Sequence, residues 1–214
     1  MAQVALIDYG SGNLHSAARA LRVAAATAGT GHEILVTDKP EDILAAERIV
    51  LPGVGHFADC AAGLRACPGV EEALTEAVPK GGKPFFGICV GMQLMATTGL
   101  EDGHTPGLGW IRGMVERIEP GDGYRIPHMG WNGLIFPRPH PVLSGLGEDP
   151  HVYFTHSYAM HPGQHEEIAA TAEYGRPLVA AVARDNMFGT QFHPEKSQRV
   201  GLQILANFLT WAPQ

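Results

Sequence analysis

PFFGICVGMQ, residues 84–93, places a cysteine between two glycines directly after a short apolar run. The pattern G-x-C-x-G is the thiol form of the nucleophile elbow, in which a strand turns at once into a helix and exposes the residue at the bend. Glycine is needed beside such a bend because larger neighbouring side chains would clash there. We therefore predict a strand over 84–88, the bend at Cys89 and a helix over 90–98.

Cys89 fits two interpretations. As a nucleophile it would lie at a helix N-terminus, where the helix dipole favours the thiolate and the Val90 N–H would point toward a developing oxyanion. As a small apolar residue it would pack in the core, where free cysteines are most often found. Gln93 lies one helical turn further on, so its amide would contact a substrate on the same face, cap the helix or face solvent.

A thiol nucleophile needs a histidine base and an acceptor that orients the ring. The segment GTQFHPEKS (189–197) offers His193 and Glu195 on either side of Pro194, whose fixed φ we expect to keep the chain extended. Side chains two residues apart on an extended segment point the same way, so Glu195 would accept a hydrogen bond from His193. The alternative is a surface histidine beside a surface glutamate.

Two glycine-rich segments follow expected strands. In VLPGVGHF (50–57), Gly53 and Gly55 flank Val54, and this segment would either present a second oxyanion donor or form an ordinary strand-to-helix turn. DYGSGN (8–13) begins like a dinucleotide-binding loop, but His15 occupies the position of the third glycine, so that fingerprint fails.

Apolar segments along the chain indicate the fold class. We predict strands over 4–9, 32–36 and 48–51, alternating with helices over 13–28, 58–66 and 70–78. Such alternation is typical of an α/β fold with an open, mostly parallel sheet and helices on both faces. For the second half we predict strands over 108–118, 151–160, 167–174, 178–185 and 187–193, then a last helix with Ser197 as its N-cap. We expect one domain over 1–214, with an antiparallel extension in its second half.

Composition excludes several classes of protein. The chain carries 15 Lys+Arg against 22 Asp+Glu, and a net charge of −7 does not favour nucleic acid. Its three cysteines form no C-x-x-C pair, and His151, His156, His161 and His165 have no metal-ligand spacing, so we expect no metal and no cofactor. The longest uncharged stretch, 84–100, is too short and polar to span a membrane, and no leader precedes Asp8, so we expect a cytoplasmic protein.

Taken together, PGVG, GICVGMQ and HPEKS resemble the triad (class I) glutamine amidotransferases, whose fold is flavodoxin-like. DYGSGNL and PHMGWN (127–132) narrow the resemblance to the branch that serves histidine biosynthesis as glutaminase subunits. The resemblance implies that Cys89 attacks the side-chain amide of glutamine, that His193 moves the proton and that Glu195 orients His193. It also implies a partner, a cyclase subunit with a (β/α)₈ barrel, which would receive the ammonia in a heterodimer.

The same resemblance implies roles for further residues. The oxyanion would be stabilised by Val90 and by the peptide between Gly53 and Val54, the latter after a backbone flip. Glutamine would be bound by Gly55, Gln93, Ser157 and Tyr158. The interface with the cyclase would include Asn13, His128, Trp131, Asn132 and Lys196. For Trp131 the alternative is a core aromatic, but Pro127 and Gly130 predict a loop, and binding residues concentrate on loops.

Two other classes of function compete with the glutaminase. A cysteine hydrolase or peptidase of similar fold would act alone on another acyl substrate, although Gln93 and the PHMGWN segment favour the amidotransferase. A catalytically silent binding subunit would be expected to lack one of Cys89, His193 and Glu195, and the sequence has all three.

Overall fold

A seven-stranded sheet runs through the centre of the computed structural model, which describes residues 3–213. Its strands are β1 (Gln3–Ile7), β2 (Glu33–Thr37), β3 (Arg48–Leu51), β4 (Phe85–Ile88), β11 (Ile168–Glu173), β12 (Pro177–Arg184) and β13 (Met187–Thr190). In the order β11-β12-β13-β4-β3-β1-β2, the strands from β13 to β2 are parallel, and β12 and β11 continue the sheet antiparallel. The predicted open, mostly parallel sheet is confirmed.

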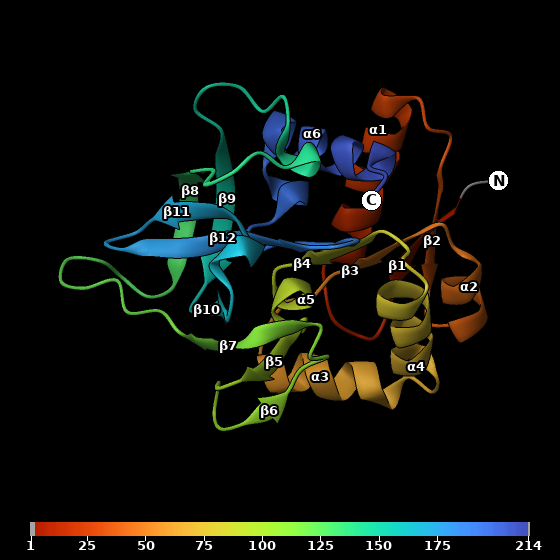
Figure 1. Ribbon diagram of the computed structural model, residues 1–214, viewed down its shortest axis with the longest axis horizontal. Helices are drawn as coiled ribbons and strands as arrows, with labels where there is room; N and C mark the ends of the chain where they lie inside the picture. The colour runs from red at the N-terminus through yellow and green to blue at the C-terminus, as the bar shows by residue number, and fades with distance from the viewer. Residues whose placement is uncertain (1–2, 214) are drawn as a thin grey trace.

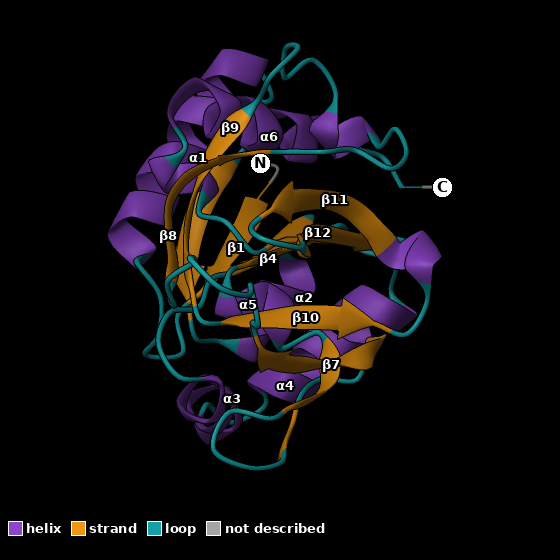
Figure 2. Ribbon diagram, turned by 90° about the vertical axis from the view of Figure 1, so that its left-hand side faces the viewer, coloured by secondary structure: helices purple, strands orange, loops and turns teal. Residues whose placement is uncertain are grey.

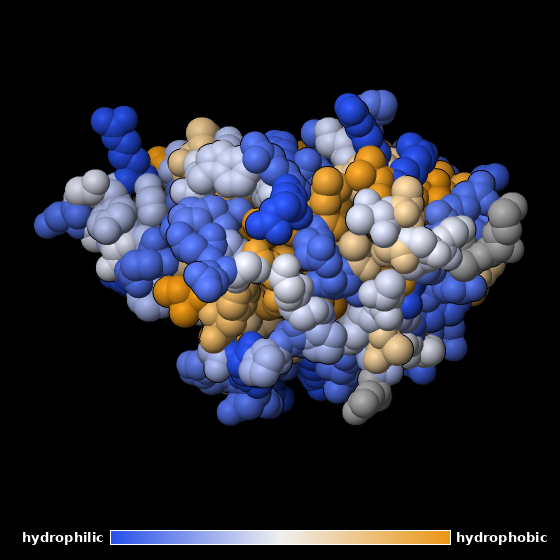
Figure 3. All heavy atoms as spheres, turned by 90° about the horizontal axis from the view of Figure 1, so that it is seen from above, coloured by the Kyte–Doolittle hydropathy of each residue, from blue (hydrophilic) through white to orange (hydrophobic). Residues whose placement is uncertain are grey.

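Helices cover both faces of this sheet (Figure 1). One face carries α1 (Leu14–Ala28) and α6 (Gln198–Thr210), whose apolar faces pack against each other. The other carries α2 (Pro40–Ala45), α3 (Phe57–Ala66) and α4 (Val70–Thr75), which continues into a π-helical turn, η1 (Glu76–Lys80). Because both faces are covered, the central strands β3 and β4 are almost wholly apolar, as expected for a parallel sheet. Seen over α1 and α6, the surface is mostly hydrophilic (Figure 3).

The second half adds two small sheets beside the carboxyl ends of the parallel strands (Figure 2). One contains β5 (Ala96–Gly99), β6 (Thr105–Pro106), β7 (Ile111–Arg117) and β10 (Tyr158–Pro162), in the order β10-β7-β5-β6. The other pairs β8 (His128–Gly133) with β9 (His151–His156), antiparallel. Short 3₁₀ turns, η2 (Pro141–Leu143), η3 (His165–Glu167) and η4 (Pro194–Lys196), complete the chain. No helix among residues 3–213 has the length and apolar character needed to cross a bilayer.

The helix predicted over 90–98 is wrong beyond its first turn. Helix α5 spans only Val90–Gln93, and the chain then enters β5. The β-branched pair Thr97 and Thr98 favours a strand, and the Thr98 hydroxyl donates to the carbonyl of Thr105 on β6. The apolar residues Met92, Leu94 and Met95 gave the segment a helical pattern. In the structure they are buried in the short helix α5 and in the turn that follows it.

Two further predictions about the second half are wrong. The strand predicted over 151–160 is two strands, because the chain turns at Ser157 from the β8–β9 pair into the four-stranded sheet. The loop predicted at PHMGWN is largely strand β8, in which Gly130 adopts φ 126°, a value open to glycine. The sequence pattern also missed α2, a helix of only six residues.

Candidate active site

Three of the predicted site segments lie at the ends of neighbouring parallel strands. Strand β4 leads into Cys89, β3 on one side leads into residues 52–55, and β13 on the other side leads into residues 191–193. The carboxyl ends of parallel strands in an open α/β sheet form the usual ligand-binding edge of the fold. Residues far apart in the sequence therefore converge because of strand order.

Cys89 lies on a strained bend between β4 and α5. Its backbone has φ 54° and ψ −110°, a conformation that non-glycine residues rarely adopt. A Cβ on Gly87 would lie 2.7 Å from the Gly91 carbonyl oxygen, and a Cβ on Gly91 would overlap the carbonyl oxygen of Leu51. The two glycines are thus required for the bend, as the sequence predicts.

Replacing Gly91 by alanine should destabilise the fold, because the contact with Leu51 is backbone and cannot rotate away. We expect Gly91→Ala to lower the free energy of unfolding by about 3 kcal/mol, the upper end for an overpacked core site. Gly133→Ala is the control, since a Cβ there has only ordinary contacts, the nearest at 3.7 Å. Urea unfolding measures both variants, and equal midpoints for the two would contradict the steric argument.

His193 and Glu195 form a buried pair. The Nδ1 atom of His193 lies 2.8 Å from Oε1 of Glu195, and both side chains are at most 3% exposed. Burial lowers the pKa of His193, but hydrogen bonds with Cys89 and Glu195, together with their charges, outweigh it and raise that pKa to about 10. Because Nδ1 is taken by Glu195, Nε2 is the ring nitrogen left for Cys89.

Pro194 positions this pair differently from the prediction. It begins the 3₁₀ turn η4 instead of extending the chain. The hydroxyl of Ser197 donates to the His193 carbonyl at 2.7 Å and accepts from the Tyr153 N–H at 3.0 Å. Ser197 occupies the N-cap position of α6, but its side chain makes no capping bond. Its hydroxyl instead links the backbone of His193 to that of Tyr153 on β9.

The predicted oxyanion donors are both engaged in this conformation. The Val90 N–H donates to the Gly53 carbonyl at 3.3 Å, and the Val54 N–H donates to the Ser11 hydroxyl at 3.3 Å. Rotation of the peptide between Gly53 and Val54 would withdraw that carbonyl and release the Val90 N–H. In this conformation neither N–H is free to bind an oxyanion.

Side chains from two neighbouring elements hold the segment 52–55 in place. The Tyr9 hydroxyl donates to the Pro52 carbonyl at 2.6 Å. The Ser11 hydroxyl and the Cys60 thiol both bond the Val54 carbonyl, at 2.9 and 3.3 Å. Ser11 therefore contacts both the N–H and the C=O of Val54. Rotation of the peptide between Gly53 and Val54 has to break the bond from the Val54 N–H, whereas the bonds to the Val54 carbonyl belong to the next peptide.

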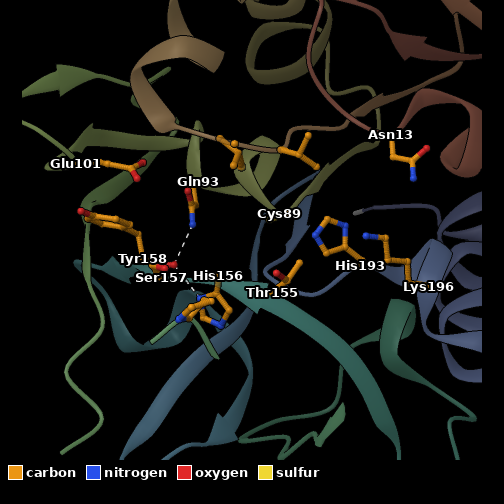
Figure 4. Close-up of a pocket in the computed structure, with 14 residues that line it drawn as sticks. Asn13, Cys89, Gln93, Glu101, Thr155, His156, Ser157, Tyr158, His193 and Lys196 are labelled. Carbon is orange, nitrogen blue, oxygen red and sulfur yellow. Dashed lines mark hydrogen bonds between the residues drawn. The ribbon is translucent and has the colours of Figure 1, made fainter. Parts of the chain in front are cut away.

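A cavity of about 540 Å³ opens over Cys89 (Figure 4). Its volume suits a small metabolite. The predicted site residues that line it are Asn13, Val54, Gly55, Cys89, Val90, Gln93, Ser157, Tyr158, His193 and Lys196. The turn at Ser157 explains why residues 155–158 form one wall, because it carries the chain across the carboxyl ends of the parallel strands. Among residues 3–213, no three His, Cys, Asp or Glu side chains group closely enough to hold a metal ion.

The predicted interface residues divide into two sets. Trp131 is 49% exposed, so it is no core aromatic, and its ring packs 6.1 Å from that of Tyr153, which also lies under the Lys196 ammonium. His128, by contrast, is only 3% exposed, and the Asn132 amide donates inward to the Glu173 carbonyl. His128 is therefore buried behind this face, and its place at an interface stays a prediction.

The sequence reasoning missed polar residues at the cavity, among them Glu101, Thr155 and His156, and one polar residue behind Cys89, Gln191. Glu101 lines the cavity opposite His193, and its carboxylate accepts from the Phe57 N–H. Gln191 is fully buried, and its amide donates to the Cys89 sulfur at 3.7 Å. Glu101 follows no recognisable motif, whereas the position of Gln191 two residues before His193 on the same strand end was a signal that could have been used.

A thiol on a strand–helix bend, with a histidine–glutamate pair from the adjacent strand, defines a class of cysteine-dependent amide hydrolases on an α/β sheet. Residues 5–211 match the family described as glutamine amidotransferase class-I. The chain is 55% identical to the imidazole glycerol phosphate synthase subunit HisH of Caulobacter vibrioides, over the full length of both chains. It is also 55% identical to the same subunit of Rhizobium meliloti, covering 99% of this chain and all of that one. The chain belongs to the class-I glutamine amidotransferase family and, within it, to the HisH family.

Solved structures support the same fold. A crystal structure of a glutamine amidotransferase has a TM-score of 0.72 at 20% identity, covering 97% of this chain and 99% of that chain. A glutamine amidotransferase from Thermotoga maritima has a TM-score of 0.60 at 16% identity, covering 91% of this chain and 76% of that chain.

Proposed function

We propose that the chain is the glutaminase subunit of an imidazole glycerol phosphate synthase, hydrolysing L-glutamine to glutamate and ammonia. The observation that carries this is the convergence of Cys89, His193 and Glu195 at the carboxyl ends of two neighbouring strands, β4 and β13, with Cys89 and His193 lining one cavity. The names of the full-length relatives supply the particular synthase. We place the activity in one domain over 1–214, in the cytoplasm.

In the proposed reaction His193 takes the proton of the Cys89 thiol, the sulfur attacks the carbon of the side-chain amide, and a tetrahedral oxyanion forms. His193 gives the nitrogen a proton, the carbon–nitrogen bond breaks and ammonia leaves. Water then attacks the resulting glutamyl thioester, His193 takes up its proton, and glutamate leaves as the thiol is restored. Glu195 holds the ring and stabilises the imidazolium, as in other triads.

Charge and placement support binding of an amino acid in the cavity. Glu101 offers a carboxylate to the substrate α-ammonium, at a point where Tyr158 also lines the wall. Gln93 is 3% exposed and reaches the cavity from α5. We propose that Gly55, Gln93, Ser157 and Tyr158 bind glutamine, joined by Glu101.

We propose that the ammonia passes to a (β/α)₈-barrel cyclase subunit, where it joins a phosphoribulosyl precursor. The products would be imidazole glycerol phosphate and an aminoimidazole carboxamide ribotide. Exposed apolar side chains beside the cavity support a docking face there: Met129 is 62% exposed and Trp131 is 49% exposed, both on β8. Lys196 and Asn13 lie at the same edge of the cavity, whereas Asn132 would act from beneath this face.

The occupied oxyanion donors lead to a test of the whole proposal. The isolated chain should hydrolyse glutamine slowly, because the Val90 N–H donates to the Gly53 carbonyl and is not free to stabilise the oxyanion. With a ligand-loaded cyclase subunit the rate should rise by roughly 10²–10³-fold, the usual value of one oxyanion donor. Glutamate release is measured for the chain alone, with the cyclase, and with the cyclase and its ligand. Equal rates in all three samples, or no glutamate in any, would contradict the proposal.

A further inference from the structure

A continuous run of hydrogen bonds connects strand β8 with the floor of the cavity. The Asn132 amide nitrogen lies 3.2 Å from Nε2 of His128, and Nδ1 of His128 lies 2.9 Å from Nε2 of His156. At the far end, Nδ1 of His156 lies 2.8 Å from the carbonyl oxygen of Tyr158. Both histidines are buried, and neither belongs to the triad.

The direction of every bond in this run is fixed by its last member. A carbonyl oxygen only accepts, so Nδ1 of His156 donates and its Nε2 must accept if the ring is neutral. It follows that Nδ1 of His128 donates and that its Nε2 accepts from the Asn132 amide. Each ring therefore carries its single proton on Nδ1. Burial lowers the pKa of both His128 and His156 to about 4, which keeps them neutral.

The Tyr158 carbonyl is also the point where the run meets the predicted substrate contacts. It accepts a second bond, at 3.0 Å, from the Gln93 amide nitrogen, and the two bonds converge on it in Figure 4. The same Gln93 nitrogen donates to Oε1 of Gln191 at 3.0 Å, and the Gln191 amide in turn reaches the Cys89 sulfur. Both hydrogens of the Gln93 amide are thus used, which leaves its oxygen to accept from a ligand in the cavity.

Packing holds the first ring of the run in place. His128 is stacked between the rings of Phe154 and Tyr174, at centroid distances of 4.6 and 4.1 Å. An apolar ring would fill this stack without the cost of burying polar nitrogens. The imidazole supplies what an apolar ring lacks, namely a donor on one side and an acceptor on the other.

We propose that His128 and His156 are positioning residues: they carry the hydrogen-bond polarity that the Tyr158 carbonyl sets out to Asn132, and through this run they hold that carbonyl where it orients the Gln93 amide. The oxygen of Gln93 is then held toward the substrate as an acceptor, which favours a ligand that presents N–H groups. The expected effect on substrate binding rests on the proposed function, in which glutamine is the substrate. The positions of the protons on His128 and His156 do not depend on that function.

Nuclear magnetic resonance of the full-length chain, labelled with ¹⁵N at its histidines, tests the polarity directly. At neutral pH we expect both His128 and His156 to carry their proton on Nδ1. A proton on Nε2 of either ring, or a protonated ring, would overturn the proposal. This measurement does not depend on enzyme activity. It therefore distinguishes failure of the proposed run of hydrogen bonds from failure of the proposed function.

Three variants, assayed for glutaminase activity in the complex with the cyclase, test the consequence. His156→Leu removes the donor to Tyr158 and should raise KM for glutamine roughly tenfold, the value of one hydrogen bond, with kcat within about threefold of wild type. His156→Asn restores an amide N–H at the position of Nδ1 and should recover most of this loss. His151→Leu is the control, because His151 lies half-exposed on the same strand and, among residues 3–213, its ring bonds only Asp149. Equal increases in KM for the leucine and asparagine variants of His156 would overturn the proposal.

Asn132→Asp reverses the polarity with almost no change of shape. A carboxylate only accepts, so His128 would have to turn its proton toward residue 132 or become protonated. Either response breaks the fixed order of donors and should raise KM for glutamine by a similar factor. It should also move the histidine ¹⁵N signals of His128 and His156 together. An unchanged pair of signals would show that the two rings are not coupled to residue 132.

Discussion

Cys89→Ala is expected to reduce glutamine hydrolysis by 10⁴-fold or more, on the order found when a triad nucleophile is removed. The reason is that no other group takes its place. Gln191 and Gln93 are amides, and the thiol of Cys60 is bonded to the Val54 carbonyl behind the segment 52–55. Steady-state glutamate release in the complex with the cyclase measures the effect, and mass spectrometry of the quenched wild type seeks the glutamyl adduct.

Cys67→Ala is the matched control for this loss. Cys67 lies at the C-terminus of α3, is only partly buried and lines none of the cavity over Cys89. Its removal should leave the rate within about twofold of wild type. If Cys89→Ala kept its activity, or if the adduct mapped to Cys60 or Cys67, the assignment of the nucleophile would be wrong.

The triad could be predicted because each member has a local signature. Cys89 requires Gly87 and Gly91 around it, and the steric reason for those glycines can be stated without coordinates. His193 and Glu195 are two residues apart and need no tertiary contact to meet. The expectation succeeded although its geometry was wrong, because a 3₁₀ turn at Pro194 also brings the two side chains to 2.8 Å.

Residues that depend on non-local contacts could not be predicted in the same way. Glu101 reaches the cavity because the chain leaves α5 after one turn and enters β5, and the apolar pattern there favoured a longer helix. His128 was expected on an interface loop, but pairing of β8 with β9 turns it inward against His156. Side chains alternate between the two faces of a strand, but this alternation does not reveal which face of a two-stranded sheet will pack against the rest of the protein.

Glu195→Gln is expected to lower kcat by roughly 10²–10⁴-fold, as when the acid of a Ser-His-Asp triad loses its charge. The amide keeps the shape of the side chain and still offers an oxygen to Nδ1 of His193. It no longer stabilises the imidazolium, so the pKa of His193 falls from its raised value. Departing ammonia takes its proton from His193, and the alkaline limb of the pH–rate profile should therefore move to lower pH.

The same substitution has a predictable effect on stability. Bonds with Cys89 and Glu195 raise the folded-state pKa of His193 to about 10, above the unfolded value of about 6.5, so together they stabilise the fold fully below pH 6.5. That contribution is lost as the pH rises toward 10. Wild type and Glu195→Gln should therefore differ most in unfolding free energy near pH 6, and the difference should narrow at alkaline pH. Glu76→Gln, which removes a solvent-exposed carboxylate paired with Lys80, is the control and should show no such trend. A gap between wild type and Glu195→Gln that widened with rising pH would mean that Glu195 does not stabilise a protonated His193.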